Sequence, residues 1–312
     1  MPFIKRFIFE MSIVCSIFIS WGLVNSAIAQ ELVITRPATS LYQEPSLTGK
    51  TNGSVVIGSS VKLLEKSRNG KALKISSSTG KIGWIVTSQA KIIDQKPLHT
   101  ILLEVARAYM LRPEEDSSPN LEVEKWIMSL KNDKNFTSLQ IAELELYRLL
   151  CIQKIARTVQ PDNTKLKTWV STHKNYVYYS DYGNAGYFLD PQLLWKLESS
   201  IPVNTPLKEQ VAFEASNLEI GGECEGYWVC VLERAMNKAG NYLKKYPNGK
   251  NAAFFVNNLK EELGALPIDS IKEMDAADQK STKKLASEWR AVLAKVPDSA
   301  AKKSLLAIFN KI

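Results

Sequence analysis

The sequence predicts a multidomain fold in which a small all-β barrel is followed by a mainly α-helical, helix-hairpin domain that contains one β-hairpin. Two observations support this division. Residues 31–95 consist of short runs rich in Val, Ile, Thr and Ser between glycine-containing turns, whereas residues 98–312 carry apolar residues at helical spacing. A third observation, an apolar N-terminal segment, concerns the compartment. The chain of 312 residues is long enough for two domains beyond that segment.

The N-terminal segment has the parts of a secretory signal peptide. Lys5 and Arg6 form a basic start, residues 11–24 are almost wholly apolar, and Ala27-Ile28-Ala29 is a small-x-small cleavage site. The apolar run is shorter than the roughly 20 residues that a membrane-spanning helix requires. We therefore expect residues 1–29 to be removed after Ala29, giving a periplasmic or secreted protein without a transmembrane anchor. A retained anchor is the alternative.

Residues 31–95 contain the runs that predict strands. Asn-Gly, Thr-Gly and Gly-Ser-Ser sequences, which favour tight turns, separate these runs. The clearest runs are Val55-Val56-Ile57, Val61-Lys62-Leu63-Leu64, Leu73-Lys74-Ile75 and Ile82-Gly83-Trp84-Ile85-Val86. Closely spaced short strands in a segment of this length predict a small barrel or sandwich, with a groove between its loops.

The same segment resembles the bacterial SH3-like domain family over about a fifth of the chain. The matching residues are Ser40–Pro45, Val56–Gly58, Val61–Leu64 and, most specifically, Gly80-Lys81-Ile82-Gly83-Trp84-Ile85, which has the Gly-x-x-Gly-Trp-Ile/Val ending of that family. The resemblance implies an SH3-like barrel and, because members commonly bind the cell wall or its peptides, an envelope ligand. The family often has an aromatic residue where this chain has Lys71-Ala72, so the resemblance does not support an aromatic-lined groove. A spacer without a ligand is the alternative.

Charge adds a prediction about the ligand of this domain. Residues 31–95 carry nine Lys/Arg and four Asp/Glu, a net charge of +5. Outside the cytoplasm such a domain favours acidic envelope polymers or anionic membrane surfaces rather than nucleic acid. Cations flank the two predicted turns at Asn69-Gly70 and Thr79-Gly80, so we predict that strand pairing gathers them at one end of the barrel. These candidate ligand-binding residues are Arg68, Lys71, Lys74 and Lys81, and Trp84 is predicted to support the fold.

Helical patterns begin after a short linker around Gln95-Lys96-Pro97. Apolar spacing predicts one helix from Leu98 to just before Arg112-Pro113, a second from about Leu121 to Leu130, and a third from Thr137 to Val159. Cys151 lies on the apolar stripe of the third helix. We therefore interpret Cys151 as a small buried hydrophobic residue rather than a nucleophile, which would need a helix N-terminus and a histidine partner.

A tyrosine-rich segment interrupts the helices. Tyr176–Tyr179 and Tyr187–Leu189 flank a turn at Asp181–Asn184, which predicts a β-hairpin. Tyrosine combines a large apolar surface with a polar tip, a combination that suits glycan or peptide contacts. The candidate ligand-binding residues of this hairpin are Tyr176, Tyr178 and Tyr182. Simple packing of the hairpin on neighbouring helices is the alternative.

The rest of the chain shows a degenerate internal repeat. Trp195, Tyr242 and Trp289 are 47 residues apart, and each lies on a predicted helix that ends at a proline. The expected capping residues of the helices that follow are Thr205, Asn248 and Asp298. These units resemble tetratricopeptide-type repeats, whose arrays offer concave surfaces to protein partners. An ordinary irregular helical domain is the alternative.

Few residues predict chemistry. Cys224 and Cys230 flank a glycine-rich bend, so an oxidising compartment favours a structural disulfide between them. His99 and His173 have no companion at ligand spacing, so no metal site is predicted. We also predict no cofactor and no catalytic residue.

The sequence therefore predicts a non-enzymatic envelope protein that acts in binding or as a scaffold. The SH3-like domain would tether it to cell-wall peptidoglycan or peptide, and the helical region would bind a protein partner. The alternative is a cell-wall-modifying enzyme with its active site in the helical region. Such an enzyme would need two carboxylates across a cleft, for which Glu214 and Asp190 are possible choices.

Overall fold

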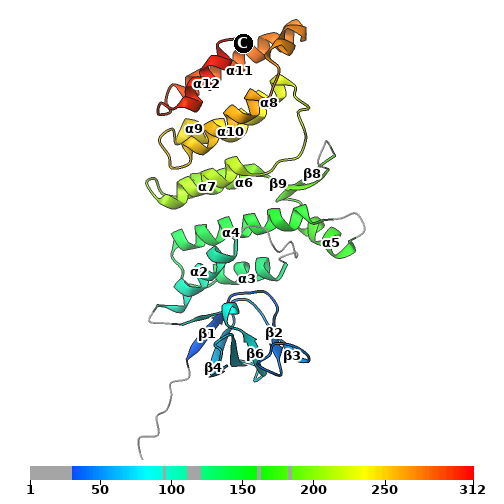
Figure 1. The fold of residues 1–312 in the computed structure, drawn as a ribbon, viewed down its shortest axis with the longest axis vertical. Coiled ribbons are helices and arrows are strands. Elements are labelled where there is room, and N and C mark those ends of the chain that lie inside the picture. Colours follow the sequence, from blue (N-terminus) through cyan, green and yellow to red (C-terminus); the bar gives the residue numbers. More distant parts are fainter. Residues whose placement is uncertain (1–29, 94–95, 111–120, 160–162, 182–184) are drawn as a thin grey trace, which may run out of the picture. The chain divides into compact units, whose positions relative to one another are not determined.

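The computed structural model describes residues 30–93, 96–110, 121–159, 163–181 and 185–312. They form two compact units, one ending at Val105 and the other beginning at Ala106. This division falls within helix α2 (Leu98–Met110), a few residues beyond the linker predicted around Pro97 (Figure 1). The expected signal peptide lies outside the described residues. Each unit is described by itself below.

The first unit contains a seven-stranded antiparallel sheet in the order β3-β2-β6-β5-β4-β1-β7. Its strands are β1 (Glu31–Ile34), β2 (Thr39–Tyr42), β3 (Thr51–Val55), β4 (Ser60–Lys66), β5 (Ala72–Ser77), β6 (Ile82–Val86) and β7 (Ala90–Ile92). A short 3-10 helix, η1 (Thr87–Gln89), joins β6 to β7. Gly70 and Gly80 occupy the tight turns before and after β5 with φ of +68° and +78°, a conformation that glycine adopts without strain.

The prediction of a small SH3-like barrel is wrong. Strands β3 and β7 form the two edges of the sheet, and no pairing joins these edges within the described residues, so the sheet is open. Strand β1 pairs with β4 on one side and with β7 on the other. This strand was not among the predicted runs, and its insertion extends the sheet beyond the β4-β5-β6 meander. Alternation and turn residues predicted strands correctly but carried no information on which edges meet.

One face of the sheet buries an aliphatic core. Its buried members are Leu32, Ile34, Leu41, Val55, Val61, Leu73, Ile75 and Ile85. Trp84 precedes Ile85 on β6 and therefore points to the opposite face. It is nevertheless only 6% exposed, and the Lys74 ammonium lies 5.8 Å from the centre of its ring. Trp84 thus supports the fold, as the sequence predicted.

The second unit is built from helices and one hairpin. The helices that precede the hairpin are α3 (Leu121–Lys131), α4 (Ser138–Arg157) and α5 (Thr164–Thr172). The hairpin consists of β8 (Val177–Ser180) and β9 (Gly186–Leu189). The later helices are α6 (Pro191–Ser200), α7 (Pro206–Asn217), α8 (Trp228–Ala235), the π-helix η2 (Met236–Gly240), α9 (Asn241–Lys245), α10 (Ala252–Gly264), the 3-10 helix η3 (Ile268–Glu273), α11 (Ala276–Leu293) and α12 (Ala300–Phe309).

Several predicted elements are present close to their expected bounds. The helices α3 and α4 match the second and third predicted helices, and Thr137 caps α4 by accepting a hydrogen bond from the Gln140 amide. The predicted hairpin pairs Val177 with Leu189 in antiparallel register. Cys151 is buried in the middle of α4, and burial raises the pKa of its thiol, which disfavours the nucleophilic thiolate.

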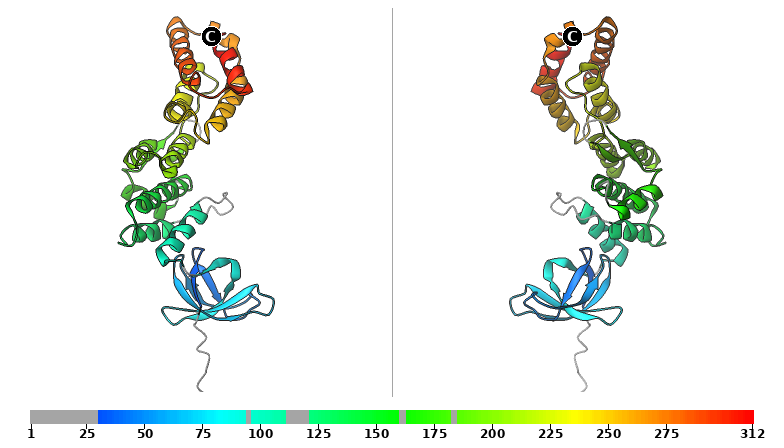
Figure 2. Two further views of the ribbon diagram at one scale, coloured as in Figure 1. Left: turned by 90° about the vertical axis from the view of Figure 1, so that its left-hand side faces the viewer. Right: turned by 90° about the vertical axis from the view of Figure 1, so that its right-hand side faces the viewer.

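The predicted helix pairs are also present. Prolines 202, 247 and 297 separate α6 from α7, α9 from α10 and α11 from α12, and these pairs pack in succession along the second unit (Figure 2).

Of the three capping residues expected for these helices, only Thr205 is the N-cap. Asn251 and Ser299 take the other two positions, because the turns after Pro247 and Pro297 run further than the sequence suggested. Of the three repeat markers, Tyr242 and Trp289 are fully buried, whereas Trp195 is only partly buried.

The predicted disulfide between Cys224 and Cys230 is present and closes the loop that leads into α8. Within the ranges described above, no helix combines the length and apolar character that crossing a membrane requires.

Candidate binding groove of the helical unit

A groove of about 630 Å³ opens on the second unit between the hairpin, α6 and the π-helix. We call it the hairpin groove and define it by its aromatic residues Tyr176, Tyr178 and Trp195 together with the π-helix residues Asn237 and Lys238. Cavities of this size are typical of ligand sites. Because π-turns inside helices occur frequently at functional sites, the position of η2 beside the groove is informative.

The aromatic part of the groove's apolar surface comes from Tyr176, Tyr178 and Trp195, beside smaller apolar residues such as Ala215 and Ile220. Tyr178, which lies on β8, is 37% exposed, and its ring packs against Phe188 with centroids 5.9 Å apart. Its hydroxyl accepts a hydrogen bond from the Gly221 amide at 3.3 Å, which ties the hairpin to the chain before α8. Trp195, on α6, has the Lys245 ammonium 5.0 Å from its ring centre. These contacts hold the rings in place and leave surface for a ligand.

Side-chain amides supply most of the polar lining. Asn175, Gln192, Asn237 and Asn241 all border the groove. Each such amide offers both a donor and an acceptor, which matches the two groups of a peptide bond. Asn241 uses one donor within the helix, because its Nδ2 lies 2.9 Å from the Asn237 carbonyl oxygen. Its carbonyl oxygen is not engaged by this bond.

The charged lining residues are Lys174, Lys238 and Asp190. Asp190 caps α6, because its Oδ1 accepts the Gln192 amide at 2.9 Å. Lys238 forms no ion pair or hydrogen bond with any residue in the described part of the chain. Desolvation, followed by repulsion from Arg234, lowers the pKa of Lys238. The groove therefore presents two ammonium groups and one carboxylate that is partly committed to a helix cap.

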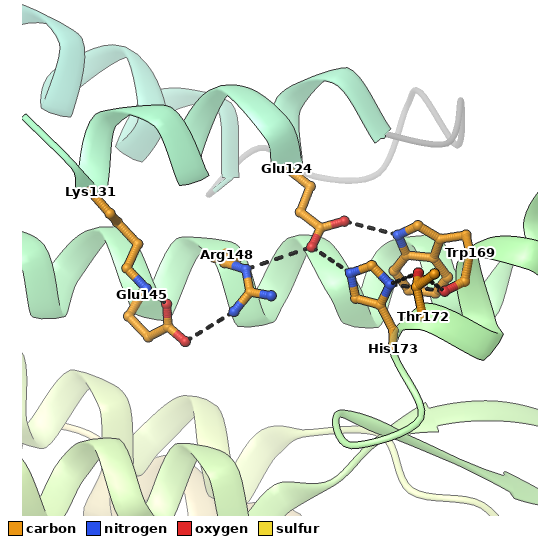
Figure 3. A network of polar contacts seen from close by, with 7 residues as sticks. All are labelled: Glu124, Lys131, Glu145, Arg148, Trp169, Thr172 and His173. Atoms are coloured by element: carbon orange, nitrogen blue, oxygen red, sulfur yellow. Dashed lines mark hydrogen bonds and ion pairs between the residues drawn. The ribbon is translucent and has the colours of Figure 1, made fainter.

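A buried polar network centred on Glu124 supports the segment that leads into the hairpin (Figure 3). The two Glu124 oxygens accept hydrogen bonds from Trp169 Nε1 at 2.9 Å and His173 Nε2 at 2.8 Å. The other ring nitrogen of His173 lies 2.8 Å from the Trp169 carbonyl oxygen. The same nitrogen, Nδ1, lies 2.9 Å from the Thr172 hydroxyl, so polar contacts hold the His173 ring at both of its nitrogens.

Arg148 connects this network to the groove. Its guanidinium lies 3.6 Å from Glu124 and 3.3 Å from Glu145, and it stacks 4.5 Å from the centre of the Tyr176 ring. Desolvation lowers the pKa of Arg148, but its hydrogen bond with Tyr176 and the two nearby carboxylates outweigh that effect and raise it. The charged guanidinium therefore fixes the orientation of Tyr176 where this residue enters the groove.

The structure brings together two of the three tyrosines predicted as ligand-binding residues. Tyr176 and Tyr178 both line the hairpin groove. Tyr182, the third, lies outside the described residues. Tyr179 is 58% exposed, packs edge-on against Tyr187 and is not among the groove residues. This difference follows from strand alternation, which the sequence did predict.

The four cations predicted to gather in the first unit are separated. Arg68 and Lys71 flank the turn before β5, whereas Lys81 follows the turn after it. Consecutive turns of an antiparallel meander lie at opposite ends of the strand that they share, so these cations cannot form one cluster. Lys74, within β5, lies 3.8 Å from Glu65 on the neighbouring strand. The prediction that they meet at one end is therefore wrong.

Sequence reasoning missed Trp195, Asn237, Lys238 and Asn241 as groove residues. Trp195 was noticed only as a repeat marker. Asn237 and Asn241 are four residues apart in a segment predicted to be helical. This spacing places two side-chain amides on one side of a helix and could have marked them as a candidate binding pair. The π-turn that contains Lys238 has no signature in the sequence.

The carboxylates considered for an enzyme do not form a pair. Asp190 caps a helix at the groove, whereas Glu214 lies on α7 and does not line the groove. Desolvation raises the pKa of Glu214.

In another cavity, Glu198 and Glu209 each accept a tyrosine hydrogen bond at 2.6 Å. Desolvation raises the pKa of Glu198, but hydrogen bonds from Lys245 and Tyr246 outweigh this and lower it, which suits an ion-pair partner better than a general acid.

Among the described residues, no cluster of three or more His, Cys, Asp or Glu side chains is arranged to hold a metal ion. Comparisons with protein-family models, curated proteins and solved structures found no match to this chain.

Proposed function

We propose that this chain is a non-enzymatic binding protein of the cell envelope whose helical unit holds an extended peptide segment of a partner protein in the hairpin groove. The observation that carries this proposal is the combination, in one groove, of three aromatic rings with the helix-borne amides of Asn237 and Asn241.

The two asparagines are neighbours along one continuous helical run. Asn237 lies in the π-helix η2 and Asn241 is the first residue of α9. Each side-chain amide can offer a donor or an acceptor to the backbone of a bound peptide. The aromatic surfaces of Tyr178 and Trp195 then offer area for the alternating side chains of the bound segment.

The proposal is tested with a random peptide library that is selected on the full mature chain, after which the affinity of a selected peptide is measured by fluorescence anisotropy. Asn237→Ala and Tyr178→Ala should each weaken binding by about fivefold, because each removes a hydrogen-bonding or stacking partner worth roughly 1 kcal/mol. The matched controls, Asn257→Ala on α10 and Tyr179→Ala on the outer surface of the hairpin, should leave the affinity unchanged.

Two results would contradict the proposal. One is that no library peptide binds the parent protein better than it binds the Asn237→Ala and Tyr178→Ala variants. The other is co-sedimentation with purified peptidoglycan that these two substitutions abolish, which would assign the groove to a cell-wall glycan.

A further inference from the structure

A second cavity, of about 310 Å³, lies between α7, the α8–η2 helix and α10. We call it the inter-helix pocket. Its polar lining consists of Ser216, Asn217, Arg234, Lys238, Asn258 and Glu262. The apolar part is formed by small and large side chains from α8, η2 and α10, including Phe255 and Leu259. The volume suits a compact small molecule.

The two cations of the pocket are not neutralised by any carboxylate within ion-pair distance among the described residues. Arg234 Nη2 donates to the carbonyl oxygens of Ile220, Gly221 and Gly222 at 3.0, 3.2 and 2.6 Å. These bonds fix the guanidinium but leave its charge uncompensated, since carbonyls are neutral. Lys238 lies one helical turn further on and is half-buried. Both cations line the same pocket, so an anionic group bound there can lie near the two of them.

The pocket also contains a carboxylate that forms no ion pair or hydrogen bond among the described residues. Glu262 lies on α10, lines the pocket and remains exposed, which places it at the opening. It forms no hydrogen bond or ion pair with another described residue. Desolvation raises the pKa of Glu262, and the nearby Lys238 and Arg234 only partly offset this. A ligand cation beside Glu262 would restore the interactions that the carboxylate lacks.

Ser216 provides an independent indication that the pocket is made for a polar ligand. Its side chain is 1% exposed and lines the pocket, and its hydroxyl has no hydrogen-bond partner. Buried hydroxyls without a partner are uncommon in folded proteins, because such a group loses its hydration without replacement. A polar ligand atom in the pocket would supply the missing partner.

We propose that the inter-helix pocket binds a small zwitterion of the α-amino acid class. The ligand carboxylate pairs with Arg234 and Lys238, its ammonium pairs with Glu262, and an apolar side chain packs against Phe255 and Leu259. A simple anion is disfavoured because Glu262 repels it, and a simple cation is disfavoured because Arg234 and Lys238 repel it. The site goes beyond the proposed peptide-binding function and does not depend on it.

The test is to measure, by isothermal titration calorimetry, the affinity of the full mature chain for free amino acids in both enantiomers. The tightest binder is then compared with two analogues, one lacking the ammonium and one lacking the carboxylate; for leucine these are 4-methylpentanoate and 3-methylbutylamine. The zwitterion should bind at least about tenfold more tightly than either analogue, because each analogue leaves a charged group of the pocket unpaired.

Variants of two residues establish the site. Glu262→Gln should weaken zwitterion binding by about tenfold and leave binding of the carboxylate-only analogue undiminished. Its neighbour Glu261, which does not line the pocket, provides the control Glu261→Gln, for which no change is expected. Ser216→Ala should weaken binding about threefold or more without lowering stability, because the hydroxyl is already unsatisfied. Lys238 is avoided because it also lines the hairpin groove.

The proposal is overturned if no amino acid binds at concentrations up to about 10 mM, or if the carboxylate-only analogue binds the parent as tightly as the zwitterion does. Binding of a library peptide in the hairpin groove should be the same in Glu262→Gln as in the parent. Failure of either proposal therefore leaves the other open to its own result.

Discussion

Glu124 is the residue on which the buried network beneath the hairpin groove depends. It accepts hydrogen bonds from Trp169 and His173 and lies 3.6 Å from Arg148. Glu124→Gln replaces one acceptor with an amide donor that faces these donors, and it leaves the Arg148 charge partly unpaired in a buried site. We expect a loss of about 3 kcal/mol in the free energy of unfolding, measured by urea denaturation.

The control for this prediction is Asp269→Asn. Asp269 forms an exposed ion pair with Lys272 at 2.8 Å. Exposed pairs contribute little because water and salt screen them, so no measurable change is expected. Equal stabilities of Glu124→Gln and the parent protein would show that the network does not stabilise the second unit.

Glu104 gives the first unit a predictable dependence on pH. Hydrogen bonds from Lys91 and Lys96, the latter at 2.7 Å, lower the pKa of Glu104 from 4.5 to about 2. A carboxyl group with a lowered pKa stabilises the folded state above its unfolded pKa, and this stabilisation is lost as the pH falls. We therefore expect the contribution of Glu104 to disappear between about pH 4.5 and pH 2.

Acid titrations of stability in the parent and Glu104→Gln check this expectation. The variant should lack the part of the acid destabilisation that Glu104 causes, and the difference should shrink at high salt because the lysines are largely exposed. Parallel acid curves for the two proteins would contradict the prediction.

The residue scale also shows what the sequence could and could not predict about function. Tyr176 and Tyr178 were placed on one face of the hairpin because strand alternation is a local property that spacing reveals, and both line the hairpin groove. The four cations do not meet, because their positions depend on which end of β5 each turn occupies. Lys238 was not identified, because its importance arises only when α7, α10 and the hairpin surround it.

At the scale of elements, Gly221 fixes the hairpin against the chain that precedes α8. A Cβ at this position would lie 2.3 Å from Ser180 Cβ and 2.8 Å from Phe188 Cε2. Gly221→Ala must therefore displace the hairpin that carries Tyr178. We expect a loss of about 1–3 kcal/mol in the free energy of unfolding, as is typical of overpacked sites, together with weaker peptide binding in the hairpin groove.

Gly264→Ala is the matched control, because a Cβ there meets no atom within 4 Å and the residue lies at the end of α10. Its stability should equal or slightly exceed that of the parent, since alanine restricts the unfolded chain. If both alanine variants were equally stable, the contact between Gly221 and the hairpin could not be as tight as the structure indicates.

The elements themselves were predicted to different extents. Helices α3 and α4 were predicted because apolar periodicity is a local signal. The open sheet was not, because β1 gains its two neighbours through pairings with distant residues. The π-turn in η2 was not predicted either. It is packed against Trp289, since a Cβ on Gly240 would lie 3.4 Å from that ring.

At the scale of the whole molecule, compartment and covalent structure are linked. The disulfide between Cys224 and Cys230 requires an oxidising environment to persist. Closing so short a loop contributes about 2 kcal/mol in the chain-entropy model. A chain held in a reducing cytosol would lose that contribution in the loop that leads into α8, so α8 is expected to be held more firmly in an oxidising compartment.

We predict that the exported product begins at Gln30, after cleavage of the segment with the basic start, short apolar run and Ala-x-Ala site. Intact-mass analysis of the extracytoplasmic protein should give the mass of residues 30–312 less two hydrogens for one disulfide. Non-reducing peptide mapping should recover Cys224 joined to Cys230, with Cys151 alkylated only after unfolding because it is buried in α4. A retained N-terminus, a lipid adduct, or a bridge from Cys151 to either partner would contradict the prediction.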